Sequence, residues 1–126
     1  MNKNRVNRIS EEVRKVVSEL LFNGLKDPRV SSMTTVTKVE VTRDLSFANI
    51  YISVLGDEVE KENSLAGLES AKGYIRKEIG SRIDLRYVPL PIFHLDESIE
   101  KGIQMSKLIE EVNKGVPDRR DDNNEQ

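Results

Sequence analysis

The chain has 126 residues, of which 37% are hydrophobic and 33% charged, and it carries a formal net charge of −2 with no cysteine. A chain of this length suits one compact domain with a modest core. The absence of cysteine excludes disulfides, thiolate catalysis and cysteine-bound zinc, and it is typical of a cytoplasmic protein. Nothing resembles a transmembrane run or a secretory leader, so we expect no association with a membrane.

Charge is distributed unevenly along the chain. Before Glu11 the charged side chains are all basic, whereas residues 116–126 hold more acids than arginines. An acidic tail lowers the mean charge without affecting a basic surface elsewhere. We therefore expect residues 1–115 to form the folded domain and residues 116–126 to be a disordered, charged tail.

The first predicted element is an amphipathic helix. Apolar residues recur at three- and four-residue spacing from Val6 to Leu21, and Gly24 is placed to end the helix. Three basic residues on the polar face are candidate RNA contacts: Arg5, Arg8 and Lys15. Glu12 and Glu19 share that face, so an ordinary salt-bridged surface explains the pattern equally well.

Two strands are predicted next. Residues 34–42 are rich in threonine and valine, which favour strands. After a short polar break, residues 47–54 alternate strictly, so the two segments predict an antiparallel hairpin. The alternate residues Ala48, Ile50, Ile52 and Val54 should face the helices. Phe47 and Tyr51 would lie on the other face, where they either stack on RNA bases or simply cover the sheet.

Residues 59–83 have the pattern of a helix that is interrupted at Ala71 and Gly73 without a proline. Glycine in a helix interior costs about 1 kcal/mol relative to alanine, so we expect a kink there. A helix that restarts at Gly73 would direct free N–H groups at a phosphate. The basic residues that follow are candidate RNA contacts: Lys72, Arg76, Lys77, Arg82 and Arg86. Only Arg82 has an acidic partner at helical spacing, Glu78.

The last predicted elements are a strand and a helix. Pro89 and Pro91 confine the next segment to an edge strand that begins after Pro91. Asp96 or Ser98 can then cap a final helix that ends near Gly115. The order helix, strand, strand, broken helix, strand, helix predicts an α+β domain. Its helices should cover one face of a three-stranded sheet and leave the other face partly open.

The residues present do not support an enzyme. His94 is the only histidine, and without cysteine it cannot complete a metal or nucleophile site, so we expect it to be structural or solvated. The acids in residues 57–62 lack the glycine-directed spacing of a calcium loop, and a solvated helix start explains them better. No Walker-type phosphate loop is present. We expect no metal, no cofactor and no small-molecule substrate.

Several short motifs occur in a specific order and spacing. In chain order they are Arg5-Val6, Asp27-Pro28-Arg29, residues 39–46 running into residues 48–53, residues 71–76, residues 85–89 and Asp96-Glu97-Ser98. Each motif alone is weak, but their joint order is specific. From Arg5 to Val112 the chain resembles bacterial ribosome-binding factor A.

The resemblance implies a type II KH fold in which Ala71-Lys72-Gly73 replaces the usual Gly-x-x-Gly loop. It also implies an assembly factor for late maturation of the 30S small ribosomal subunit. Such a factor binds 16S rRNA, aids processing of the precursor's 5′ end and acts as a monomer. The sequence departs from the family pattern at Leu90, where an acid is expected. Its tail is also short and acidic, so no tail function is carried over.

The alternative is a protein-interaction module that docks on ribosomal proteins without direct RNA contact. It would use the open sheet face and the edge strand near Ile92. The salt dependence of binding to naked RNA separates the two hypotheses, because phosphate contacts give a steep slope and a protein-only interface gives a shallow one.

Overall fold

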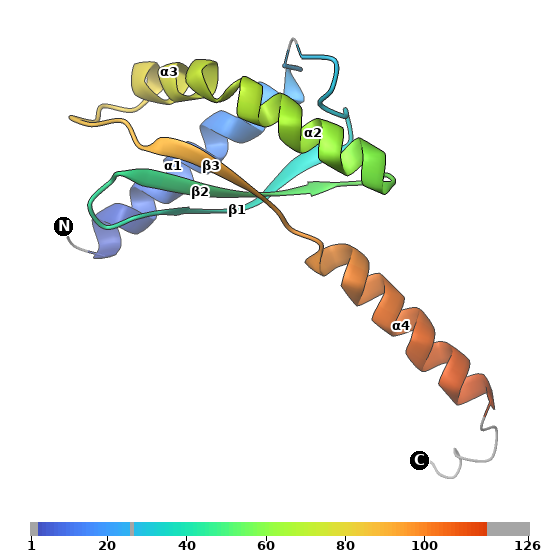
Figure 1. The fold of residues 1–126 in the computed structure, drawn as a ribbon. Helices are drawn as coiled ribbons and strands as arrows, with labels where there is room; N and C mark the ends of the chain where they lie inside the picture. The colour runs from blue at the N-terminus through green and yellow to red at the C-terminus, as the bar shows by residue number, and fades with distance from the viewer. Residues whose placement is uncertain (1–2, 26, 116–126) are drawn as a thin grey trace. The chain divides into compact units, whose positions relative to one another are not determined.

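The computed structural model describes residues 3–25 and 27–115. In chain order its elements are α1 (Lys3–Phe22), β1 (Thr34–Val41), β2 (Phe47–Val54), α2 (Glu58–Ser70), α3 (Lys72–Arg82), β3 (Leu90–Leu95) and α4 (Ser98–Gly115) (Figure 1). This is the predicted order, with the interrupted helix present as two helices. The predicted tail, residues 116–126, lies outside the described residues. The chain divides into two units, Met1–Asp96 and Glu97–Gln126.

The sheet has the strand order β1-β2-β3, with β1 antiparallel and β3 parallel to the central strand. The predicted hairpin is therefore confirmed, and a register shift at Thr37 interrupts its ladder. β3 is an edge strand, as predicted, but it begins at Leu90, and the prediction that it begins after Pro91 is wrong. Pro91 pairs with Ala48 inside the strand. An edge strand tolerates proline because only one of its sides needs ladder donors.

The core lies between the sheet and the helices α1, α2 and α3, which cover one of its faces (Figure 1). The apolar stripe of α1 is buried, and so are the alternate residues of β2 that begin with Ala48. Ile75 and Ile79 bring α3 into the same core. Phe47 and Tyr51 lie on the opposite side of β2, as predicted, because successive side chains of a strand alternate between its faces.

The loop after α1 begins with a left-handed residue. Gly24 has a φ of +85°, and its N–H donates to the Leu21 carbonyl at 3.2 Å. This conformation favours glycine and ends the helix, as the sequence predicts. The chain can therefore turn sharply from α1 toward the end of α2.

α4 is an amphipathic helix. Met105, Leu108, Ile109 and Val112 recur at helical spacing, and each is more than half exposed. The helix begins at Ser98, and the carbonyl of Glu97 accepts from the Lys101 N–H at 2.9 Å. This is the first backbone hydrogen bond of α4, and the prediction that Asp96 or Ser98 caps the helix stays a prediction. The Asp96 carboxylate accepts a hydrogen bond from the Thr37 hydroxyl at 2.7 Å.

Candidate nucleic-acid interface

A single residue, Ala71, separates α2 from α3. Its φ of −89° and ψ of 0° depart from helical values. Its N–H donates to the Gly67 carbonyl at 3.0 Å, and its carbonyl accepts from the Ile75 N–H at 2.9 Å. Ala71 therefore takes part in the hydrogen bonding of both helices. The predicted kink is confirmed, but α3 restarts at Lys72 rather than at Gly73.

The N-terminus of α3 differs from that of α2. α2 begins with a capping box, in which Asp57 accepts from the Glu60 N–H and Glu60 accepts from the Asp57 N–H. α3 has no acid in its first turn and no side-chain cap within the described part of the chain. Its backbone N–H groups and the positive end of its dipole therefore suit an external anion.

The cations of α3 differ in their contacts. Lys72 lies 3.0 Å from the Glu69 carboxylate, so the prediction that Lys72 has no such partner is wrong. The Arg76 guanidinium donates from Nε and Nη2 to the Val88 carbonyl at 3.2 and 3.0 Å, which holds it against the segment before β3. Lys77 is exposed and has no charged partner among residues 3–25 and 27–115.

Arg82 is bound within the protein. Its guanidinium lies 2.5 Å from Glu19 and 3.1 Å from Glu78, so the predicted Glu78–Arg82 pair is confirmed. The hydrogen bond from Arg82 to Glu19 is the main cause that raises the pKa of Arg82. Two carboxylates neutralise Arg82, so of the basic residues predicted to contact RNA it is the least available to a phosphate. Arg86 is exposed and lies 5.6 Å from the centre of the Tyr87 ring.

The basic residues of α1 are exposed, but acids accompany them. Arg5 and Arg8 line a hollow of about 420 Å³ together with Glu12 and Asp84. Arg82 also lines it, so the fold brings the start of α1 to the end of α3. Lys15 is exposed and does not line that hollow.

The open sheet face carries the predicted aromatic residues. The Tyr51 ring stacks on His94 with centroids 4.8 Å apart, and His94 Nε2 lies 2.9 Å from Asn49 Oδ1. His94 is thus part of the sheet surface, in line with a structural role. Tyr51 is half-buried and already stacked, whereas Phe47 is 41% exposed and is the more accessible of the two.

A residue that the sequence did not single out lies beside the junction. The Arg29 guanidinium donates to both Asp27 oxygens, at 3.0 and 2.6 Å, and to the Ser70 hydroxyl at 2.8 Å. These bonds from Arg29 lower the pKa of Asp27 to about 2. Ser70 is the last residue of α2, so this turn is attached where α2 ends. The Asp-Pro-Arg motif suggested the turn, but not its partner 41 residues away.

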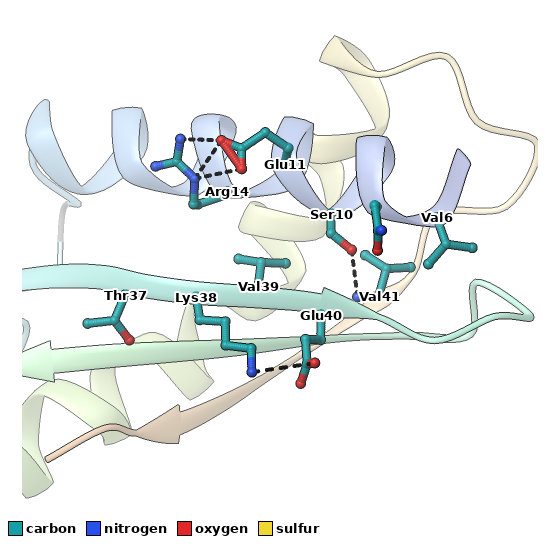
Figure 2. Close-up of a pocket in the computed structure, with 10 residues that line it drawn as sticks. Val6, Ser10, Glu11, Arg14, Thr37, Lys38, Val39, Glu40 and Val41 are labelled. Carbon is teal, nitrogen blue, oxygen red and sulfur yellow. Dashed lines mark hydrogen bonds and ion pairs between the residues drawn. The ribbon is translucent and has the colours of Figure 1, made fainter. Parts of the chain in front are cut away.

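A hollow between α1 and β1 serves as a contrast (Figure 2). Its charged side chains pair with one another: Arg14 lies 2.5 Å from Glu11, and Lys38 lies 3.5 Å from Glu40. The Val41 N–H donates to the hydroxyl of Ser10 at 2.9 Å and so links β1 to α1. The hollow offers no excess positive charge, which makes it a poor phosphate site.

The described residues contain no arrangement suited to a metal and no membrane span. No group of three or more His, Cys, Asp or Glu residues there could hold a metal ion. No helix within that part of the chain is long and apolar enough to cross a membrane.

Comparison with known proteins places the chain in a family. Residues 5–109 match the family model for ribosome-binding factor A. The ribosome-binding factor A of Clostridioides difficile is 54% identical over 96% of this chain and 94% of its own length. That of Acetivibrio thermocellus is 52% identical over 93% of this chain and 98% of its own length.

Solved structures match the fold. The crystal structure of ribosome-binding factor A from Thermus thermophilus covers 71% of this chain and 94% of its own, with a TM-score of 0.62 at 22% identity. A homology model of the ribosome binding factor A of the same organism, fitted into a cryo-electron microscopy map of a 30S complex, covers 70% of this chain and 91% of its own, with a TM-score of 0.58 at 23% identity. These matches confirm the predicted α+β, KH-like fold. The chain belongs to the ribosome-binding factor A family.

Proposed function

We propose that this protein is an assembly factor that binds the 30S small ribosomal subunit late in its maturation. It contacts 16S rRNA through the α2–α3 junction and aids processing of the precursor's 5′ end. Family membership supports the role, and so does the related Thermus thermophilus protein that was fitted into the map of a 30S complex. The observation in this chain that supports RNA contact best is the uncapped start of α3, followed within two turns by Lys72, Arg76 and Lys77.

The three cations suit phosphate contact in different ways. The Lys72–Glu69 pair is exposed, and such pairs contribute only about 0–1 kcal/mol, so Lys72 can exchange Glu69 for a phosphate. The Val88 carbonyl fixes two nitrogens of Arg76 and leaves Nη1 as a donor without a partner in the described residues. Lys77 extends into solvent. The three side chains therefore place positive charge along one side of α3, with Arg76 held in place and the two lysines free to adjust.

Gly73 gives an RNA backbone room to approach. A Cβ at this position would meet no atom within 4 Å, so no part of the protein covers the first turn of α3 there. KH domains clamp the nucleic-acid backbone at the equivalent glycine-containing loop. A phosphodiester could therefore reach the N–H groups of α3 directly.

In this proposal the protein acts by binding and performs no chemical step. It needs no cofactor and works as a monomer in the cytoplasm. Occupation of the RNA near the precursor's 5′ end would hold the substrate in a form that processing nucleases accept. Four further cations would attract the RNA over a distance rather than make fixed contacts with it: Arg5, Arg8, Lys15 and Arg86. These side chains are exposed, and acids lie beside several of them.

One observation favours a second candidate, docking on ribosomal proteins without direct RNA contact. β3 is an edge strand, so one side of it has no neighbouring strand in the sheet. An extended peptide can add to such an edge. The exposed Phe47 ring belongs to β2, the next strand of the same sheet, and could extend that interface.

Binding to naked 16S rRNA over a range of salt concentrations tests the two candidates. Phosphate contacts give a steep log–log slope, and Lys77→Ala should reduce it by about one unit. Arg14→Ala is the matched control, because Arg14 pairs with Glu11 on α1. A shallow slope that neither variant changes, together with normal binding to 30S subunits, would favour docking on proteins.

A further inference from the structure

A cavity of about 640 Å³ opens beside the α2–α3 junction. Its walls come from the end of α1, from the loop around Gly24, and from both helices that meet at Ala71. The lining residues used below are Leu20, Asn23, Leu25, Asp27, Ser70, Ala71, Tyr74 and Arg82. The volume lies within the range of about 300–1,000 Å³ that is usual for small-molecule sites.

One part of the lining suits the face of a planar ring. Leu20, Leu25 and Ala71 supply apolar surface, and Tyr74 supplies an aromatic ring that is 53% exposed. Exposed aromatic side chains at nucleic-acid surfaces stack on bases, and such stacking tolerates any sequence because every base has a π face.

Among the described residues of the lining, the charged side chains are already neutralised. Asp27 is held by Arg29, and Arg82 is held by Glu19 and Glu78. An entering ion would have to compete with these pairs. The cavity is therefore better suited to a neutral ligand than to a free phosphate or a cation.

Polar groups remain available for the edge of a ring. The Asn23 side chain has no hydrogen-bond partner within the described residues, and an amide offers both a donor and an acceptor. The Ser70 hydroxyl accepts from Arg29 and can still donate its proton. Donors and acceptors of this kind match the edges of unpaired bases, which proteins read on single-stranded RNA.

We propose that this cavity receives one unpaired nucleobase from the RNA strand that contacts the α2–α3 junction. Ala71 belongs both to the junction and to the cavity wall, so a strand whose phosphates lie along α3 can turn one base inward. The base would stack on Tyr74 and hydrogen-bond with Asn23 and Ser70. This inference rests on the proposed function, because it takes the ligand to be RNA.

The first test uses nuclear magnetic resonance of the full chain, titrated separately with the four ribonucleoside 5′-monophosphates and with ribose 5-phosphate. At least one nucleotide should shift the signals of the Asn23 side-chain amide, Gly24 and Tyr74, whereas ribose 5-phosphate should not. Equal shifts with ribose 5-phosphate would show that the site binds only the phosphate. No shift with any nucleotide at millimolar concentration would also overturn the proposal.

The second test measures the affinity for short single-stranded oligoribonucleotides. Tyr74→Ala should weaken binding at least about fivefold, and Tyr74→Phe should keep the affinity because it retains the ring. Tyr87→Ala is the matched control, because Tyr87 is 66% exposed and does not line the cavity. Asn23→Ala, a change at an exposed position, gives a second variant that should also weaken binding if Tyr74→Ala fails to fold.

The two proposals fail in different ways. If Tyr74→Ala and Asn23→Ala bind like the wild type while Lys77→Ala still reduces the salt slope, the base pocket is wrong and RNA contact at α3 stands. If the wild type binds no RNA, or binds it with a shallow salt slope, the proposed function itself is wrong.

Discussion

The guanidinium of Arg29 and the hydroxyl of Ser70 lie 2.8 Å apart and join the loop after α1 to the last residue of α2. The same nitrogen of Arg29 lies 2.6 Å from an Asp27 oxygen. Because Ala71 follows Ser70 directly, these contacts hold the point from which α3 departs. The orientation of the candidate RNA surface therefore depends on a turn that is remote from it in sequence.

Asp27→Asn should make stability less dependent on acid. Hydrogen bonds from Arg29 lower the pKa of Asp27 from 3.8 to about 2. Its carboxylate therefore contributes stability that is fully present above 3.8 and is lost as the pH falls through 2. The variant should unfold at lower urea concentration near neutral pH, and its difference from the wild type should shrink between about pH 4 and pH 2. A difference that stays constant over this range would mean that the Asp27–Arg29 contact does not stabilise the fold.

Gly67→Ala should destabilise the protein by about 1–3 kcal/mol through overpacking. A Cβ at Gly67 would lie 2.7 Å from Val30 Cγ2 and 3.3 Å from the Val30 backbone nitrogen. The backbone contact leaves little room to adjust, so the loop of residues 27–31 must move away from α2. Thermal unfolding measures the change, and a melting temperature at or above that of the wild type would contradict this packing.

Gly73→Ala is the matched helical glycine with open space around it. A Cβ there meets nothing within 4 Å, so the variant should be as stable as the wild type or gain up to about 1 kcal/mol. Its affinity for 30S subunits should nevertheless fall, because the methyl group occupies the path of the RNA backbone. Unchanged affinity in a sedimentation assay would show that RNA does not approach the first turn of α3.

Local patterns in the sequence predicted the order of the elements. The alternation of residues 47–54 placed Phe47 and Tyr51 on the outer face, and the interruption at residues 71–73 placed the kink. These features depend on residues close together in the chain. The sequence predicted that β3 begins after Pro91, but the strand begins at Leu90 and contains that proline. An edge strand can include a proline because one of its sides makes no hydrogen bonds to another strand.

The contacts of the candidate site were harder to predict. Arg29 reaches Ser70 across 41 positions, and Arg82 reaches Glu19 across 63. No local spacing rule reports such pairs. The ion pair between Lys72 and Glu69 was missed for a different reason. The break at Ala71 suggested that the two residues belong to separate helices, yet they still lie close enough to pair across it.

Removal of residues 116–126 should leave the melting temperature unchanged. Pro117 to Gln126 hold no apolar side chain beyond the proline that could pack on a core, and their acids outnumber their two arginines. The shortened chain should bind 16S rRNA at least as tightly at low salt, with the difference vanishing at high salt because of screening. A lower melting temperature, or loss of 30S binding, would show that the tail has a docking role.

RNA contact by the α2–α3 junction is tested most directly by photo-crosslinking on 30S subunits. A photoreactive amino acid replaces Lys77, with the same replacement of Arg14 on α1 as the control. After irradiation and nuclease digestion, the protein substituted at Lys77 should retain covalently bound fragments of 16S rRNA, and the control should retain few. Crosslinks from Lys77 to ribosomal proteins alone would contradict RNA contact and support docking on those proteins.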